Sequence, residues 1–202
     1  MKGTNHIISN TCSAAIGINC ILLAEHSQTI KKIDTIGVLD KIVDFLTPKQ
    51  TTDMIFIYLW WIGAVLLFYL GTLFPDCDSP NSMLGKIIHI PVEHRTWTHA
   101  IWLPLLFLIL TIWFPIVIYF VIGYIFHLLW DNLSVGGVCF FYPVSKYRYY
   151  GGSGAKIKNK HWFRLYRTGK VSEGILVGIL IMLTIGFSVF TYMYLSKSFN
   201  VN

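Results

Sequence analysis

The sequence predicts an all-α, polytopic membrane protein with about five transmembrane helices and a polar site at their cytoplasmic ends. Hydrophobic residues make up 54% of the 202 residues and charged residues only 13%, and the mean hydropathy is +0.59. Three windows, residues 54–74, 100–130 and 174–195, contain no Lys, Arg, Asp or Glu. A chain of this length and composition is typical of one membrane-embedded domain, here residues 1–202.

Two of the expected helices follow from apolar length, and two more from other patterns. Residues 54–74 and 174–195 each match the roughly 20 helical residues that cross a bilayer core of about 30 Å. Residues 6–24 mix Ser, Thr, Asn and Gly with apolar residues, which suits a helix buried among other helices. Residues 36–46 carry acids and Lys beside an apolar stripe, which predicts an amphipathic helix on the outer surface.

The window over residues 100–130 is too long for one span and short for two. Pro115 lacks a backbone N–H, favours the first turn of a new helix and pushes the preceding residue out of the α region. We therefore expect a tight hairpin near residues 112–115 between helices over residues 98–111 and 115–133. The alternative is a single long, kinked helix.

Basic residues are distributed unevenly between the two predicted sides. If five helices alternate across the membrane, the side that carries the N-terminus and the loops over residues 75–97 and 132–171 has eleven of the sixteen basic residues. The positive-inside rule then puts this side in the cytoplasm, below an inner or plasma membrane. The formal net charge of +6 is explained by topology and by attraction to anionic lipid headgroups, so nucleic acid is not an expected partner. The oligomeric state is left open.

The candidate site residues all lie on that predicted cytoplasmic side. A random distribution would divide them between the two sides, and ionisable groups held beside lipid are costly, which indicates function. We therefore expect five helix ends to converge on one polar site. The candidates are His6, Asp76, Asp78, His94, His99, His127, Asp131 and Glu173.

Imidazole and carboxylate groups together are typical ligands of a divalent metal, with Zn²⁺ the usual ion and Mn²⁺ or Fe²⁺ as alternatives. His127 and Asp131 are four residues apart, so one helical face presents both to a single cation. The same spacing also fits a hydrogen-bonded pair that caps a helix end. Cys77, between Asp76 and Asp78 in "GTLFPDCDSP", is expected to be buried rather than to bind metal.

The segment "EHRTWTHA" adds two histidines around an arginine. Thr96 or Thr98 is predicted to cap the following helix, with His99 in its first turn facing the site. Arg95 is suited to a bidentate grip on a phosphate. His94 has an alternative interpretation, which is contact with lipid headgroups.

Taken in chain order, several motifs resemble one family. His6, "LFPDCDSPNSMLG", "HRTWTH", "GYIFHLLWDNLSVGGVCFFYP" and "SEGI" are similar to the LexA-regulated, inner-membrane-associated family of metal-dependent hydrolases. The resemblance covers nearly the whole chain. It departs at Thr96, where the family has Gly, and at Ser134, where it has Thr, and neither change removes an expected ligand. A more remote similarity is to zinc-dependent phospholipase C.

The resemblance implies hydrolysis by a metal-activated water. It implies two or three zinc ions, and a role for one of Asp76 and Asp78 as ligand while the other orients or deprotonates the water. With Arg95 holding phosphate, these three residues are the expected catalytic group. The ligands implied are His6, Asp76 or Asp78, His99, His127, Asp131 and Glu173.

The predicted function is a membrane-bound phosphoesterase that acts on a phospholipid or another membrane-embedded substrate. Anionic phospholipid is the candidate partner because the site lies where headgroups lie. The alternative is a non-enzymatic membrane protein, such as a proton or ion carrier or an assembly factor, with a structural metal site. That class predicts polar residues near helix middles, whereas here they lie at one set of ends. "HRTWTH" also resembles the first histidine box of membrane fatty-acyl desaturases, but the chain has no adjacent His pair for the further boxes.

Overall fold

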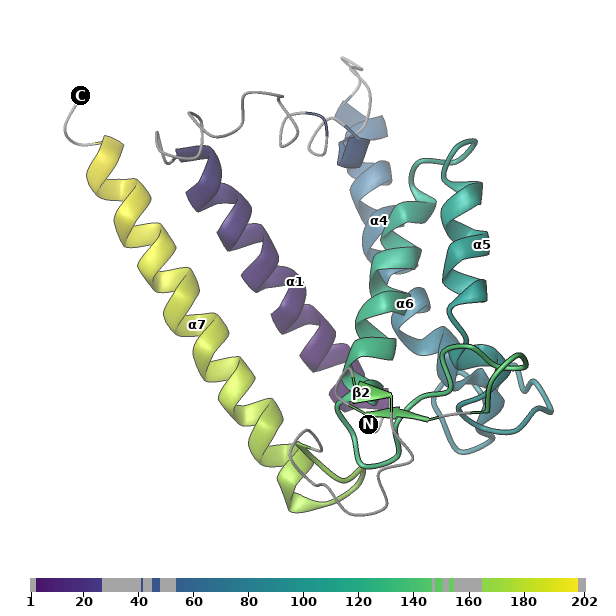
Figure 1. Cartoon of the computed structure of the whole chain (residues 1–202). Helices are drawn as coiled ribbons and strands as arrows, with labels where there is room; N and C mark the ends of the chain where they lie inside the picture. The colour runs from purple at the N-terminus through teal and green to yellow at the C-terminus, as the bar shows by residue number, and fades with distance from the viewer. Residues whose placement is uncertain are drawn as a thin grey trace.

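The computed structural model describes residues 3–26, 41, 45–47, 54–146, 148–150, 153–154 and 165–199. The predicted all-α class is confirmed (Figure 1). The amphipathic helix predicted over residues 36–46 lies largely outside the described residues. Two 3-10 turns, η1 (Phe74–Asp78) and η2 (Trp97–His99), and a small antiparallel pair, β1 (Tyr149–Tyr150) and β2 (Ser153–Gly154), accompany the helices. The helices are α1 (Gly3–His26), α4 (Met54–Leu73), α5 (Trp102–Leu110), α6 (Val117–Asn132) and α7 (Val171–Phe199).

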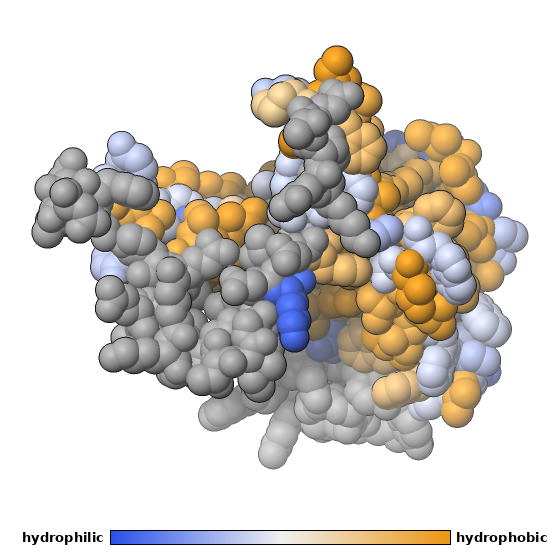
Figure 2. All heavy atoms as spheres, turned by 90° about the horizontal axis from the view of Figure 1, so that it is seen from above, coloured by the Kyte–Doolittle hydropathy of each residue, from blue (hydrophilic) through white to orange (hydrophobic). Residues whose placement is uncertain are grey.

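The surface of the helices fits a membrane. Within the described part, residues 3–23, 54–78 and 171–196 form helical segments long and apolar enough to cross a bilayer, and α6 is a shorter apolar helix. Large apolar side chains point outward, as at Leu66 of α4 and Met182 of α7, which are 64% and 75% exposed. Figure 2 shows such hydrophobic side chains around the rim of the bundle. Apolar surface of this extent is unfavourable in water and favourable in lipid.

The window after η2 forms the predicted hairpin, not one kinked helix. The chain turns between Leu110, the last residue of α5, and Val117, the first of α6, and the two helices lie side by side (Figure 1). The amides of residues 111–114 all donate to carbonyls of the preceding turn, at 3.0–3.2 Å. The tip itself is apolar and exposed, with Trp113 65% exposed. One boundary was predicted wrongly, because residues 98–101 form part of a 3-10 turn and a bend before α5 begins.

Close packing of α4 on α6 fixes the distance between their lower ends. A Cβ at Gly71 would lie 2.0 Å from the carbonyl oxygen of Phe120, and a Cβ at Gly123 would lie 2.1 Å from that of Phe68. Small residues of this kind let two helix backbones approach closely in membranes. Asn10 of α1 completes the contact, since its side-chain amide donates to the Gly123 carbonyl at 3.1 Å. The crossing therefore holds the end of α4 beside the last turns of α6.

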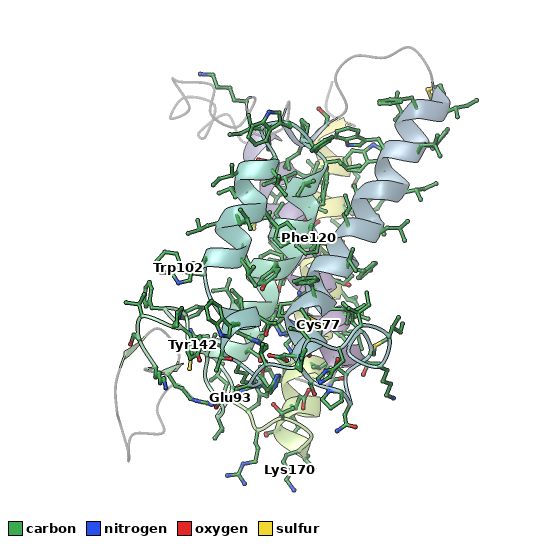
Figure 3. The ribbon with its side chains drawn as sticks, turned by 90° about the vertical axis from the view of Figure 1, so that its right-hand side faces the viewer. Cys77, Glu93, Trp102, Phe120, Tyr142 and Lys170 are labelled. Atoms are coloured by element: carbon green, nitrogen blue, oxygen red, sulfur yellow. The ribbon has the colours of Figure 1, made fainter. Side chains whose placement is uncertain are left out.

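The predicted convergence of helix ends is confirmed. The start of α1, the ends of α4 and α6, the start of α7 and the turn η2 lie at the lower end of the bundle in Figure 1. Figure 3 shows side-chain oxygen and nitrogen atoms gathered at this end, around the labelled Cys77 and Glu93. The Asn5 amide donates to Glu173 at 2.8 Å, which ties α1 to α7 there. The apolar core of Phe120, Tyr124, Leu128 and Val138 lies directly beside this polar end.

Candidate metal centre

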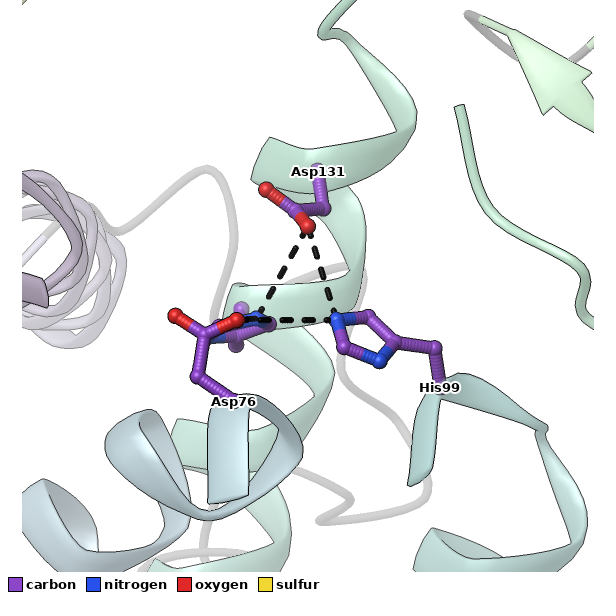
Figure 4. A group of neighbouring side chains, drawn as sticks. Asp76, His99 and Asp131 are labelled. Atoms are coloured by element: carbon purple, nitrogen blue, oxygen red, sulfur yellow. Dashed lines mark ion pairs between the residues drawn. The ribbon is translucent and has the colours of Figure 1, made fainter. Parts of the chain in front are cut away.

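Four candidate ligands from three elements meet at one point. Asp76 of η1, His99 of η2, and His127 and Asp131 of α6 each offer one ligand atom, and these atoms lie within 4.8 Å of one another. His99 Nε2 lies 3.5 Å from Asp131 Oδ2 and 3.9 Å from Asp76 Oδ1. His127 Nε2 lies 3.7 Å from Asp76 Oδ1 and 3.9 Å from Asp131 Oδ2. Figure 4 shows the side chains of Asp76, His99 and Asp131 pointing toward one another.

The donor atoms of this cluster fit a divalent cation. His127 Nδ1 lies 2.7 Å from the Thr72 carbonyl oxygen, which only accepts hydrogen bonds, so the proton is on Nδ1 and the lone pair of Nε2 faces the cluster. His99 Nε2 and His127 Nε2 are both buried, and neither has a hydrogen-bond partner in the described part of the chain. Unpaired buried nitrogens are costly, and a cation between the carboxylates would satisfy them. The residues present therefore suit a metal that takes N and O ligands.

His6 lies against this cluster but outside the group of four. Its ring stacks on that of His127, with centroids 3.8 Å apart and planes 15° from parallel. His6 Nε2 lies 3.2 Å from Asp131 Oδ1, although neither ring nitrogen forms a hydrogen bond with any described residue. The first turn of α1 thus brings a fifth candidate ligand next to the four.

Asp76 and Asp78, which are separated by Cys77, face different partners. The 3-10 geometry of η1 sends Asp76 to the group of four, whereas Asp78 Oδ1 lies 2.6 Å from His94 Nδ1 and Asp78 Oδ2 accepts the Arg95 amide at 3.1 Å. Thr98 also donates its hydroxyl to Asp78. Asp78 Oδ2 is 3.5 Å from His99 Nδ1, so it lies behind the ring whose Nε2 faces Asp76 and Asp131. Carboxylates in that position orient a metal-binding histidine.

His94 lies at the outer side of the cluster. Asp78, His94 and His99 form a second group whose ligand atoms are within 4.8 Å of one another. The His94 side chain is 43% exposed, unlike those of Asp78 and His99. It is therefore the histidine of the site that a molecule from outside can reach most easily.

Arg95 points inward. Its backbone φ of 66° turns the chain, and Nη2 lies 3.0 Å from Asp131 Oδ2 while Nη1 donates to Ser134 Oγ at 3.0 Å. Gly136 leaves room for it, because a Cβ there would lie 1.7 Å from Nη1. Arg95 thus neutralises and positions a candidate ligand, and its expected contact with phosphate stays a prediction.

Glu173 is buried beside the cluster but belongs to neither group of candidate ligands. Its carboxylate accepts from the Asn5 side chain at 2.8 Å and from the Gly169 amide, which places it between the first turns of α1 and α7. Tyr166, which no sequence pattern pointed to, is fully buried and donates to the Trp130 carbonyl at 2.7 Å. The parallel bridge between Tyr166 and Ser134 closes this side of the site. No spacing in the sequence predicts the pairing of Tyr166 with Ser134.

The predicted caps of the helix after η2 are wrong. Thr96 makes no side-chain cap and instead donates to the Glu93 carbonyl, and Thr98 donates to Asp78. Burial alone would lower the pKa of His99, but the negative charges of the nearby Asp131 and Asp78 carboxylates raise it to about 9. The ring of His99 faces the site as predicted, with Nε2 toward Asp76 and Asp131. The raised pKa means that it carries a proton at neutral pH, which an arriving cation must displace.

A helical bundle with an apolar exterior and a buried His/Asp cluster at one end defines an all-α membrane protein with a candidate metal site. The chain belongs to the YdjM inner membrane protein family, whose model matches residues 42–195. This confirms the membrane part of the resemblance seen in the sequence, and the matched residues include all of the candidate ligands except His6. No curated protein and no solved structure matches the chain significantly.

Proposed function

We propose that the chain is a membrane-bound, metal-dependent hydrolase that cleaves a phosphoester of a phospholipid or another membrane-embedded substrate. The observation that carries this proposal is the meeting of two unpaired imidazole nitrogens with two carboxylates at a single buried point. The resemblance of the motifs to LexA-regulated metal-dependent hydrolases supports it. So does the position of the cluster at one set of helix ends, where headgroups of a bilayer lie.

The ligand roles follow from the geometry. Asp76, His99, His127 and Asp131 would hold the ion, with His6 the nearest further ligand. Zn²⁺ is the ion that this donor set favours, with Mn²⁺ and Fe²⁺ as alternatives. A bound ion of this kind lowers the pKa of water toward about 7 and polarises a phosphoryl oxygen.

The surrounding residues would then serve the reaction. Asp78 holds the rings of His94 and His99 in place. His94 is partly exposed and is the group that would take a proton from the attacking water and return it to the leaving oxygen. Arg95 balances the charge of Asp131 and orients its carboxylate.

The orientation in the membrane is part of the proposal. The positive-inside count places the cluster on the cytoplasmic face of an inner membrane that the chain crosses several times. The alternating helix directions in Figure 1 are consistent with the repeated crossing and do not bear on which face the cluster occupies. The substrate would therefore come from the cytoplasmic leaflet.

A second candidate function is a non-enzymatic protein with a structural metal. The observation that favours it is burial, because His99, His127 and Asp131 are all 0% exposed. Structural zinc sites are closed by four protein ligands, whereas catalytic sites keep an open position. In that case metal removal would lower stability, and no hydrolysis would be found.

Metal analysis tests both candidates. Wild type, the double variant His127→Ala/Asp131→Ala and the control His89→Ala, an exposed histidine outside the cluster, are purified and their Zn, Mn and Fe contents measured. Wild type and control are expected to carry metal that the double variant lacks. Equal contents would end the metal proposal. The hydrolase would be supported if wild type and the control, but not the double variant, release phosphorylated headgroup from phosphatidylglycerol vesicles. The structural site would be favoured if wild type binds metal but releases no headgroup from a range of phospholipids.

A further inference from the structure

An apolar groove lies next to the metal centre. It has a volume of about 340 Å³ and lies between α4, α5, α6 and the loop that follows η1. The volume is within the roughly 300–1,000 Å³ typical of ligand pockets, but its lining offers no polar surface. A polar ligand would find no hydrogen bond there. The residues that define it include Phe74, Cys77, Leu84, Phe107, Leu110 and Phe120.

The groove runs from the hairpin toward the candidate ligands. Leu110 and Val117, at the two ends of the hairpin turn, line it at one end and Cys77 lines it at the other. Figure 3 shows Phe120 above Cys77 along the direction of the helices. Cys77 is fully buried and sits between Asp76 and Asp78. A linear apolar group in the groove would thus have one end beside the metal centre.

The rim of the groove continues into the lipid-facing surface and carries a positive charge. Leu70 on α4 lines the groove and is 43% exposed, and Ile88 on the loop lines it and is 58% exposed. The loop is held in place because the Ile90 amide donates to the Cys77 carbonyl at 3.0 Å. Lys86, exposed between the lining residues of this loop, sits where it can attract a phosphate of an anionic lipid.

We propose that this groove seats one acyl chain of an anionic phospholipid, with the phosphate end at the level of Lys86 and the metal centre. The inference rests on the proposed function for the lipid's role as substrate, while binding of the chain itself needs no hydrolysis. An entirely apolar lining, an opening to the lipid-facing surface and a neighbouring Lys together match a charged headgroup on a hydrocarbon chain. Seating the chain here would bring the phosphoester to the cluster from within the membrane.

Photolabelling of the full chain tests the groove directly. The protein is placed in vesicles of phosphatidylcholine and phosphatidylglycerol that contain a phosphatidylglycerol with a diazirine in one acyl chain, and adducts are mapped by mass spectrometry after irradiation. Adducts are expected to form more often on groove residues than on residues of the lipid-facing side of α4. Leu84→Trp and Leu110→Trp, which fill the groove at different places, should each reduce groove labelling roughly fivefold or more. Leu66→Trp, on the exposed side of α4 and outside the groove, should leave it unchanged.

Two further arms assign the outcome. Lys86→Gln should remove the preference for the phosphatidylglycerol probe over a matched phosphatidylcholine probe. Labelling spread evenly over the apolar surface of wild type would overturn the proposal. The double variant His127→Ala/Asp131→Ala should still label in the groove while releasing no headgroup. Groove labelling without any hydrolysis by wild type would support the acyl-chain groove and refute the hydrolase. Hydrolysis with evenly spread labelling would support the hydrolase and refute the acyl-chain groove.

Discussion

The ion pair of Arg95 and Asp131 offers the sharpest test of the site, since it links a buried cation to a candidate metal ligand. The two side chains are 9% and 1% exposed, and Nη2 lies 3.0 Å from Oδ2. Removing one partner of a buried pair leaves the other charge uncompensated, which costs about 3–5 kcal/mol. Arg95→Met should therefore lower the free energy of unfolding of the metal-free protein by that amount. For a chain of this size the midpoint would fall by roughly 6–20 °C.

The matched control is the exposed pair of Arg148 and Glu93. Its atoms are 3.7 Å apart and its side chains are 38% and 72% exposed, and such a pair contributes only about 0–1 kcal/mol. Thermal unfolding of both Arg→Met variants is followed by tryptophan fluorescence in detergent, with chelator and then with Zn²⁺. With Zn²⁺ the difference in unfolding midpoint between Arg95→Met and wild type should become smaller, because the positive charge of the ion then compensates Asp131. Equal shifts for the two variants, or a deficit that Zn²⁺ does not change, would refute the reasoning.

Three more predictions concern the ligands and the helix crossing. Asp78→Asn should weaken Zn²⁺ binding about 10–100-fold in chelator competition while the number of bound ions stays the same. Asp131→Asn should lose the ion altogether. Equal loss of Zn²⁺ in both variants would contradict the orienting role of Asp78. Because the pKa of His99 is raised to about 9, a proton competes with Zn²⁺, and the affinity should fall about tenfold for each pH unit below that value. A Zn²⁺ affinity that titration calorimetry finds constant between pH 6.5 and 8.5 would contradict this. Gly123→Ala should strongly lower the temperature midpoint of unfolding, since its Cβ would lie 2.1 Å from a backbone carbonyl oxygen. The control Gly178→Ala, whose Cβ would have nothing within 4 Å, should leave the midpoint unchanged or raise it slightly. Similar midpoints for the two variants would argue against the close crossing.

The sequence was sufficient for the hairpin and for the convergence of helix ends. Pro115 removes an amide and restricts its neighbour, which is a local effect that needs no tertiary information. The periodic return of His and carboxylate groups to one side of the predicted membrane likewise depends only on counting spans. Both predictions are confirmed. The side of the membrane on which the cluster lies stays a prediction.

The division of labour between Asp76 and Asp78 could not be read from the sequence. The two residues have the same chemistry, and only the 3-10 geometry of η1 sends one to the cluster and the other to His94. Arg95 was expected to grip a phosphate, and its contact with Asp131 was not predicted. The positive φ that accompanies this contact has no signature in a residue type that rarely adopts it.

The helix start was misplaced for a related reason. Thr is a residue type that often caps helices, but the Thr98 hydroxyl donates instead to the carboxylate of Asp78, a stronger acceptor twenty residues earlier in the chain. The bridge between Tyr166 and Ser134 joins residues 32 positions apart in the chain. Such long-range pairings are set by the packing of the bundle, which local spacing does not encode.

The hairpin has a further consequence for the lipid around it. At 16 residues, α6 rises only about 24 Å, which is less than a hydrocarbon core of about 30 Å. The amides of residues 111–114 are already bonded within the turn, so the tip can end inside hydrocarbon without exposing those groups. A short span of this kind draws the two leaflets toward each other, at fractions of a kcal/mol per Å of mismatch. Lipids beside α5 and α6 would therefore be compressed along their length, and they are the same lipids that border the apolar groove.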